Sequence, residues 1–159
     1  MVNYQELNQS LRALIHGVPH QTANLANASA LLYMALDRIN WAGFYLLEGD
    51  RLILGPFQGK PACIEIPIGK GVCGTAVLRR ETILVPDVHA FPGHIACDSA
   101  SNSEIVLPLF QKTAAADGTT ESRVVGVLDI DSPLKNRFTE EDRIGLTEFA
   151  EILSDALFS

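Results

Sequence analysis

Long apolar runs are missing from this sequence. None of its apolar stretches approaches the roughly 20 residues that a membrane-spanning helix needs. The N-terminal segment MVNYQELNQSLRALIHG also lacks a basic region followed by an apolar core, so it does not resemble a secretory signal. We therefore expect no membrane partner, and a cytoplasmic location in which thiols stay reduced.

Positive charge is in short supply as well. The chain has 12 Lys and Arg residues against 19 Asp and Glu residues, which gives a net charge of −7. Such a surface is repelled by nucleic-acid phosphates and by anionic lipid headgroups, so neither is expected as a partner. By contrast, 47% of the 159 residues are hydrophobic, and no repeat or linker interrupts them. The composition predicts a single domain, residues 1–159, with its own hydrophobic core.

Cysteine is scarce, and its three copies are Cys63, Cys73 and Cys97. An odd number of cysteines in segments rich in turn residues is a poor disulfide framework but suits thiol redox chemistry. We therefore expect one nucleophilic thiol and two candidate resolving thiols, because an oxidised thiol needs another thiol to regenerate it. Cys73 follows a glycine-rich turn and precedes a predicted helix, where backbone amides can lower a thiol pKa. The alternative for each cysteine is a small buried hydrophobe.

Hydrophobic periodicity predicts an α+β fold. A first helix is expected where the apolar side chains fall at helical spacing, at Leu7, Leu11, Leu14 and Ile15, and two more are expected at 22–36 and 75–79. A last helix begins after the N-cap Thr139, and its apolar stripe consists of Leu146, Phe149, Leu153 and Leu157. A period of two or a short apolar run predicts strands at 40–47, 51–57, 63–68, 82–85, 104–110 and 123–130. Most of these strands are joined by short turns, and the polar segment 112–122 reads as an exposed hairpin loop. The pattern favours an antiparallel sheet of about six strands, flanked by N- and C-terminal helices.

The segment from Pro86 to Ser103 is too long for an ordinary connection. It has little periodicity, and long structureless loops in compact domains are usually functional. His89 and His94 lie in it together with Cys97, and Cys73 would complete a possible zinc site. Because this spacing matches no strong metal-binding pattern, we favour a protein without a metal.

Three acidic residues stand beside apolar strands. Asp129 and Asp131 share a predicted strand face with Val125 and Val127, and Glu104 opens another apolar run. If the three acids converge, burial and mutual repulsion would raise the pKa of at least one of them. That acid could then serve as a general acid while the others hold an ammonium group. The alternative is a set of solvated residues at strand ends and in turns.

Trp41 and Tyr45 are expected on one face of their strand, with Gly43 between them. A glycine at this position would leave an open spot between two aromatic walls, which suits a methyl or thioether group. The alternative is ordinary core packing.

Several motifs together resemble a known family. The segments GPFQGKPACIEIPIGKGVCGTAV, VPDVHAFPGHIACDSASNSEIVLPLF and GVLDIDSP are similar to the free methionine-(R)-sulfoxide reductases, a catalytic branch of the GAF-domain superfamily. The likeness spans essentially the whole chain, including WAGFYLL and FTEEDRIGL. The hairpin segment KTAAADGTTES is a local departure that resembles an insertion away from these motifs.

The resemblance implies a GAF-like fold and a role for each candidate residue. Cys97 would be the catalytic cysteine, and Cys63 and Cys73 the resolving thiols. The substrate site would be lined by Glu104, Asp129, Asp131, Trp41 and Tyr45, with the two aromatic residues facing the substrate methyl group. The resemblance also implies a homodimer without a bound cofactor, recycled by thioredoxin and its NADPH system.

The implied reaction is the reduction of free L-methionine (R)-S-oxide to methionine. A carboxylic acid would protonate the sulfoxide oxygen while the Cys97 thiolate attacks sulfur, and the resulting sulfenic acid would condense with a second thiol. Two other hypotheses remain at this point. One is a non-catalytic GAF sensor that binds a small ligand, and the other is a thiol redox switch that signals through a partner.

Overall fold

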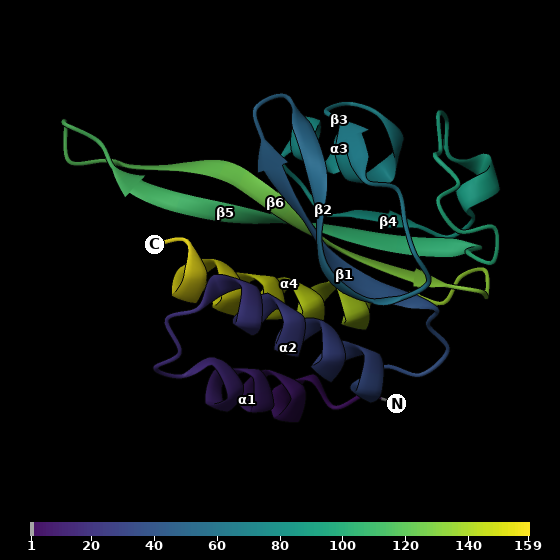
Figure 1. Cartoon of the computed structure of the whole chain (residues 1–159), viewed down its shortest axis with the longest axis horizontal. Coiled ribbons are helices and arrows are strands. Elements are labelled where there is room, and N and C mark those ends of the chain that lie inside the picture. Colours follow the sequence, from purple (N-terminus) through teal and green to yellow (C-terminus); the bar gives the residue numbers. More distant parts are fainter. Residues whose placement is uncertain (1) are drawn as a thin grey trace.

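The computed structural model describes residues 2–159 and contains a single antiparallel sheet with helices on both faces (Figure 1). Within these residues the sheet has six strands, which agrees with the predicted α+β class. The helices are α1 Tyr4–Ile15, α2 Gln21–Ala35, α3 Gly71–Arg79, α4 Glu140–Leu157 and the 3-10 helix η1 Val88–Ala90. The strands are β1 Trp41–Glu48, β2 Arg51–Gly59, β3 Glu65–Pro67, β4 Ile83–Val85, β5 Ser103–Ala114 and β6 Thr120–Ser132.

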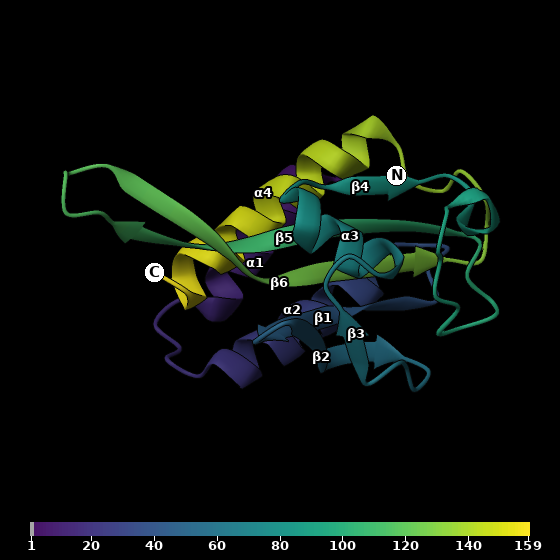
Figure 2. The ribbon, with the colours of Figure 1, turned by 90° about the horizontal axis from the view of Figure 1, so that it is seen from above.

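The strands lie in the order β3-β2-β1-β6-β5-β4, and each neighbouring pair is antiparallel. Helices α2 and α4 cover one face of the sheet, α1 packs on the outer side of these two helices, and α3 covers the other face (Figures 1 and 2). The loop between β4 and β5, which carries η1, lies at the end of the sheet near the start of β5 (Figure 2). Within residues 2–159, no helix combines the length and apolarity that a membrane span requires.

The larger hydrophobic cluster lies between the sheet and the helices α1, α2 and α4. The sequence of α4 explains its part in this cluster. Thr139 caps this helix through a reciprocal capping box with Asp142, as its predicted N-cap role requires. Leu146, Phe149 and Leu153 recur at helical spacing and are fully buried against the sheet. The predicted apolar stripe of the last helix is therefore confirmed over two turns, and its last member, Leu157, is partly buried against the same cluster.

A buried ion pair joins the start of α4 to the loop after α2. The Arg137 guanidinium bonds to Asp142 at 3.2 Å and to Asp37 at 3.2 Å. The side chains of Arg137 and Asp142 are only 5% and 9% exposed, whereas that of Asp37 is 62% exposed. Tyr4 of α1 donates a further hydrogen bond to the Asp142 carboxylate at 2.5 Å. Asp142 thus serves as helix cap and as buried counter-ion.

Three local predictions differ from the structure. The segment 112–122 is not a loop throughout, since β5 and β6 stay paired as far as Ala114 and Thr120. Helix α3 begins at Gly71 rather than near Thr75, so Cys73 lies in its first turn. Leu14, predicted on the apolar side of the first helix, is 40% exposed.

A β-bulge also corrects the face predicted for Val125. The register between β5 and β6 shifts between Leu109 and Phe110, whose partners are Gly126 and Val124. The extra residue reverses the alternation. Val125 therefore packs with the helix-side cluster, while Val127 belongs to the cluster on the α3 face. After the bulge, from Gly126 to the end of β6, the side chains alternate between the two faces of the sheet as predicted.

Candidate active site

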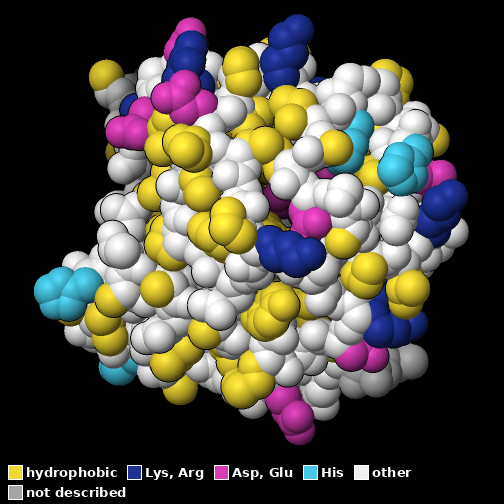
Figure 3. All heavy atoms as spheres, turned by 45° about the vertical axis from the view of Figure 1, so that its right-hand side comes forward, with side chains coloured by type: hydrophobic (Ala, Val, Ile, Leu, Met, Phe, Trp, Pro, Cys, Tyr) yellow, Lys and Arg dark blue, Asp and Glu magenta, His cyan; other side chains and the backbone are white. Residues whose placement is uncertain are grey.

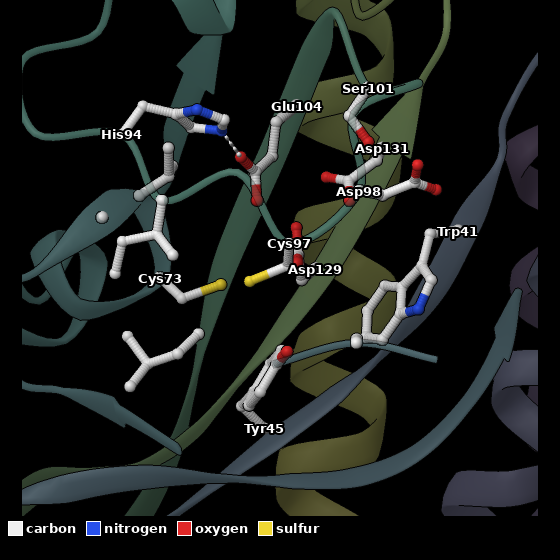
Figure 4. Close-up of a pocket in the computed structure, with 15 residues that line it drawn as sticks. Trp41, Tyr45, Cys73, His94, Cys97, Asp98, Ser101, Glu104, Asp129 and Asp131 are labelled. Atoms are coloured by element: carbon white, nitrogen blue, oxygen red, sulfur yellow. Dashed lines mark ion pairs between the residues drawn. The ribbon is translucent and has the colours of Figure 1, made fainter. Parts of the chain in front are cut away.

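A cavity opens on the α3 face of the sheet, where β1, β5 and β6 meet the loop that precedes β5. Its lining includes all the predicted site residues except Cys63, together with His94, Asp98 and Ser101 (Figure 4). The enclosed space is about 30 Å³, which is enough for a water molecule or two. Figure 3 shows acidic side chains recessed in a hollow of this surface, with histidine side chains near it.

The hairpin β5–β6 brings the three predicted acids together. Glu104 pairs across the sheet with Asp131, and Val106 pairs with Asp129, so the period of two places all three carboxyl groups on the cavity side. Glu104 and Asp129 are 7% and 6% exposed. Unlike the solvated strand-end acids considered from the sequence, these carboxyl groups are withdrawn from water.

Burial sets the protonation of these acids. It raises the pKa of Glu104 and that of Asp131 well above their usual ranges, and the negative charge of Asp129 raises both further. Burial raises the pKa of Asp129 as well, although hydrogen bonds with Glu104, Asp131 and Cys73 oppose the shift. Within residues 2–159, the Oδ1 atoms of Asp129 and Asp131 have no hydrogen-bond partner. The cluster therefore has room for a proton or for a cationic group.

Cys63 and Cys97 form a disulfide bond, and the loop before β5 supplies the second of them. The two cysteines are 34 residues apart in the sequence, and both are half-buried. Of the two resolving thiols considered from the sequence, the structure thus bonds Cys63 to Cys97.

Cys73 is the free thiol of this structure, and it is buried. It does not lie in a loop, as the sequence suggested, but in the first turn of α3. The predicted lowering of its pKa is also wrong. Burial raises the pKa of Cys73 well above its usual value, and the negative charges of Asp129 and Glu104 add to the effect. Burial, with the carboxylates on the facing strands, thus outweighs the amides of a short helix.

Trp41 and Tyr45 form a stacked aromatic wall beside the disulfide. Both are 2% exposed, and their ring centroids are 5.9 Å apart. The Trp41 indole donates a hydrogen bond to the Lys60 carbonyl at 3.2 Å, and the Tyr45 hydroxyl donates to the Cys63 carbonyl at 2.9 Å. These bonds orient the two rings, and Tyr45 is tied directly to a cysteine of the disulfide.

The open spot predicted at Gly43 does not exist. Gly43 pairs with Phe57 of β2, and a Cβ atom added at Gly43 would lie 2.2 Å from the Phe57 Cβ. The Phe57 ring instead stacks on Trp41 at a centroid distance of 5.1 Å. The glycine therefore allows the two strands to approach closely and does not create a pocket.

The histidines do not assemble the zinc site that was considered from the sequence. His89 Nε2 is 3.1 Å from the Asn102 Oδ1, and Cys97 is bonded to Cys63. His94 turns into the cavity, where its Nε2 is 3.8 Å from the Glu104 Oε1 (Figure 4). Burial lowers the pKa of His94, and the charge of His89 lowers it further.

Sequence reasoning missed a polar group at the mouth of the cavity. Asn40 Nδ2 donates to the Asp98 Oδ2 at 3.0 Å and to the Ser101 Oγ at 3.1 Å. These contacts fix the segment after Cys97 against the start of β1. A hint was present in the run Cys97-Asp98-Ser99, but nothing in the spacing linked it to Asn40.

Comparison with known proteins agrees with this geometry. The GAF domain family matches residues 9–157. The chain therefore belongs to the GAF domain family. It is 55% identical over 154 residues to the free methionine-R-sulfoxide reductase of Escherichia coli, covering 97% of this chain and 88% of that protein. By that relationship, it is a member of the free methionine-R-sulfoxide reductases.

Solved structures extend the likeness to three dimensions. The reduced form of fRMsr of Staphylococcus aureus superposes with a TM-score of 0.90 at 52% identity, over 99% of this chain and 96% of that one. The same enzyme in complex with its substrate gives a TM-score of 0.88 at 51% identity, over 99% and 97% of the two chains. The GAF-like architecture expected from the sequence is therefore confirmed.

Proposed function

We propose that this protein reduces free L-methionine (R)-S-oxide to L-methionine by thiol chemistry at Cys97. The observation that carries the proposal is the disulfide between Cys97 and Cys63, which closes over a pocket of buried carboxyl groups and two aromatic rings. A disulfide beside an acid cluster fits a reaction that consumes a proton and oxidises a thiol. The substrate is named by analogy with the Escherichia coli relative.

Recognition of a free amino acid would rest on charge. The cavity lining contains three acidic strand residues and, among the described residues, neither Lys nor Arg. Asp129 and Asp131 each have an unpartnered buried oxygen, and a substrate α-ammonium group would satisfy both. A methionine within a protein has no such ammonium group, so it would leave these acids unpaired. Trp41 and Tyr45 would contact the methyl group.

Glu104 is proposed as the proton donor. Its pKa is raised by burial and by the charge of Asp129, which favours its protonated form more than that of an ordinary glutamate. Protonation of the sulfoxide oxygen makes sulfur electrophilic, and the Cys97 thiolate attacks it. The oxygen then passes to Cys97, which becomes a sulfenic acid, and methionine leaves as the thioether.

Cys63 is proposed as the resolving thiol. Its thiol attacks the Cys97 sulfenic acid, forms the disulfide and releases water. Cys73 is less suited to this step, because it is buried in α3 and its raised pKa keeps it protonated. The disulfide itself is half-buried, which leaves it within reach of an external dithiol.

The remaining elements of the proposal come from the family resemblance. We propose thioredoxin, supplied by NADPH, as the external reductant, and a homodimer in the cytoplasm as the working form. The protein would act as one domain, residues 1–159, without a bound cofactor or metal in its catalytic cycle.

The deciding experiment compares free methionine R- and S-sulfoxides, with thioredoxin as reductant, in the wild type and in Cys97→Ser. We expect turnover of the free R epimer by the wild type and none by the variant. A sulfoxide in the middle of a peptide should be a poor substrate. Full turnover by Cys97→Ser would reject the proposal, and ligand binding without any reduction would favour a GAF sensor.

A further inference from the structure

Cys73 has no part in the proposed reaction, yet it lies among the acids that do. Its Sγ, a Glu104 carboxylate oxygen and an Asp129 carboxylate oxygen all lie within 4.8 Å of one another, and all three residues are buried. Two atoms bonded to one metal ion are at most about 4.6 Å apart, because such bonds are about 2.0 to 2.3 Å long, so the three atoms are close enough to share an ion after small side-chain movements.

A second observation points to a cation at the same place. Asp129 is 6% exposed, and its Oδ1 has no hydrogen-bond partner among residues 2–159. Burying such an atom costs free energy unless a proton or a cation satisfies it. The described lining of the cavity includes His94 but neither Lys nor Arg, so the protein supplies no permanent positive charge there.

Reduction of the disulfide would add a fourth ligand. The sulfur atoms of Cys73 and Cys97 point toward one another across the cavity (Figure 4). While Cys97 is bonded to Cys63, its sulfur is not a thiolate and is a poor ligand. Once released, it would give a set of two thiolates and two carboxylates. Zinc and cadmium accept such a mixed tetrahedral set, whereas magnesium and calcium prefer oxygen alone.

We propose that the reduced protein binds one thiophilic divalent cation, such as Zn²⁺, through Cys73, Cys97, Glu104 and Asp129, and that disulfide formation weakens this site. Binding releases the protons of the two thiols and of the Glu104 carboxyl group, and it changes no oxidation state. The ion occupies the cavity that the proposed substrate ammonium would use, and it holds the thiol that would attack sulfur. The cation is therefore an inhibitor that acts on the reduced form.

Sulfur distinguishes this site from a simple ammonium pocket. An ammonium ion needs only the carboxylates, so loss of the Cys73 thiol would leave its binding intact. A zinc or cadmium ion loses a strong ligand with the same change. Replacement of Cys73 therefore distinguishes a metal site from a simple ammonium pocket.

The experiment titrates Cd²⁺ into chelator-treated protein that has been reduced and freed of reductant under nitrogen. Thiolate-to-cadmium absorption in the ultraviolet reports the number of sulfur ligands. We expect saturation at one equivalent for the reduced wild type, and about half the absorption for Cys73→Ser and for Cys97→Ser. The oxidised wild type should bind at least about tenfold more weakly. Excess Zn²⁺ should displace the cadmium signal.

Cys63→Ser is the matched control, because it removes a thiol outside the cluster and prevents the disulfide. It should bind Cd²⁺ like the reduced wild type, whether or not it is treated with reductant. Equal signals from wild type and Cys73→Ser, or equal affinities of the reduced and oxidised wild type, would overturn the proposal. The comparison of the reduced with the oxidised wild type needs no variant, so a folding defect in a variant cannot affect it. Because binding is read without sulfoxide, a negative result leaves the reductase proposal standing.

Discussion

Glu104 and Asp131 face each other directly across β5 and β6, and both carboxyl groups enter the same buried cavity. Two acids held this way cannot both ionise without cost. The proposed reaction needs a proton from this cluster and a negative charge for the substrate ammonium. The cross-strand pair provides both, and it also makes the site unfavourable for the stability of the empty protein.

The first prediction concerns Glu104→Gln. The pKa of Glu104 is raised on folding, so its contribution to stability is full below its usual value of 4.5 and is lost as the pH rises. An amide in its place does not ionise. The variant should therefore lose less thermal stability than the wild type between about pH 5 and about pH 8, while sulfoxide reduction falls by about 10² to 10⁴.

Thermal unfolding across this pH range, in buffer that contains a chelator, measures the first effect. Asp155→Asn offers a comparison, because Asp155 is an exposed acid outside the cavity. If the wild type and Glu104→Gln lose stability in parallel, Glu104 is not the group that resists ionisation.

Asp131→Asn tests recognition of the free amino group. The amide cannot acquire the negative charge that Asp131 would carry beside a bound ammonium group, so KM for free methionine sulfoxide should rise by about tenfold or more. The wild type should discriminate strongly against the N-acetylated sulfoxide, and the variant should discriminate less. Steady-state kinetics with both substrates gives the comparison. If the ratio of the two kcat/KM values is the same in the wild type and in Asp131→Asn, the substrate ammonium group does not bind at Asp131.

The disulfide predicts different fates for two cysteine variants. Cys63→Ser should complete one turnover and then stop, because nothing resolves the oxidised Cys97 efficiently. Cys73→Ser should still form the bond between Cys63 and Cys97 after exposure to substrate. Mass spectrometry of alkylated peptides distinguishes the products. A disulfide between Cys73 and Cys97 in the wild type would show that Cys73 resolves the intermediate.

Arg137 provides a prediction about stability away from the site. Asp142→Ala leaves the buried guanidinium without its buried partner, removes a helix cap and should cost about 3 to 5 kcal/mol. Asp37→Ala removes an exposed partner of the same guanidinium and should cost about 1 kcal/mol or less. Urea unfolding measures both. Equal losses would mean that burial does not decide the strength of these pairs.

Local patterns predicted much of the fold. The capping signal at Thr139 and the apolar spacing of Leu146, Phe149 and Leu153 were sufficient to predict the last helix, because neighbouring residues determine both. The Val-rich end of β6 likewise indicated that Asp129 and Asp131 share a face. Where the prediction failed, the cause was non-local: the bulge that moves Val125 arises from the register with β5.

The same distinction holds for the site. The alternation of side chains along a strand was enough to place Trp41 and Tyr45 on one face. It could not show that Phe57, from the next strand, fills the space at Gly43. Spacing alone left Cys63 and Cys73 equally able to pair with Cys97. Tertiary structure separates them, since α3 buries Cys73, and this burial, together with the nearby carboxylates, raises the pKa of its thiol. The link from Asn40 to Asp98 joins residues 58 positions apart and has no sequence signature.

The small cavity of the disulfide form has a kinetic consequence. A space of about 30 Å³ is far below the roughly 300 Å³ of an ordinary ligand pocket, so the oxidised protein has no room for an amino acid. Under the proposed function, sulfoxide cannot occupy an enzyme molecule that is waiting for its reductant. The two half-reactions then alternate strictly, and double-reciprocal plots at different reductant concentrations should be parallel lines without inhibition by excess sulfoxide.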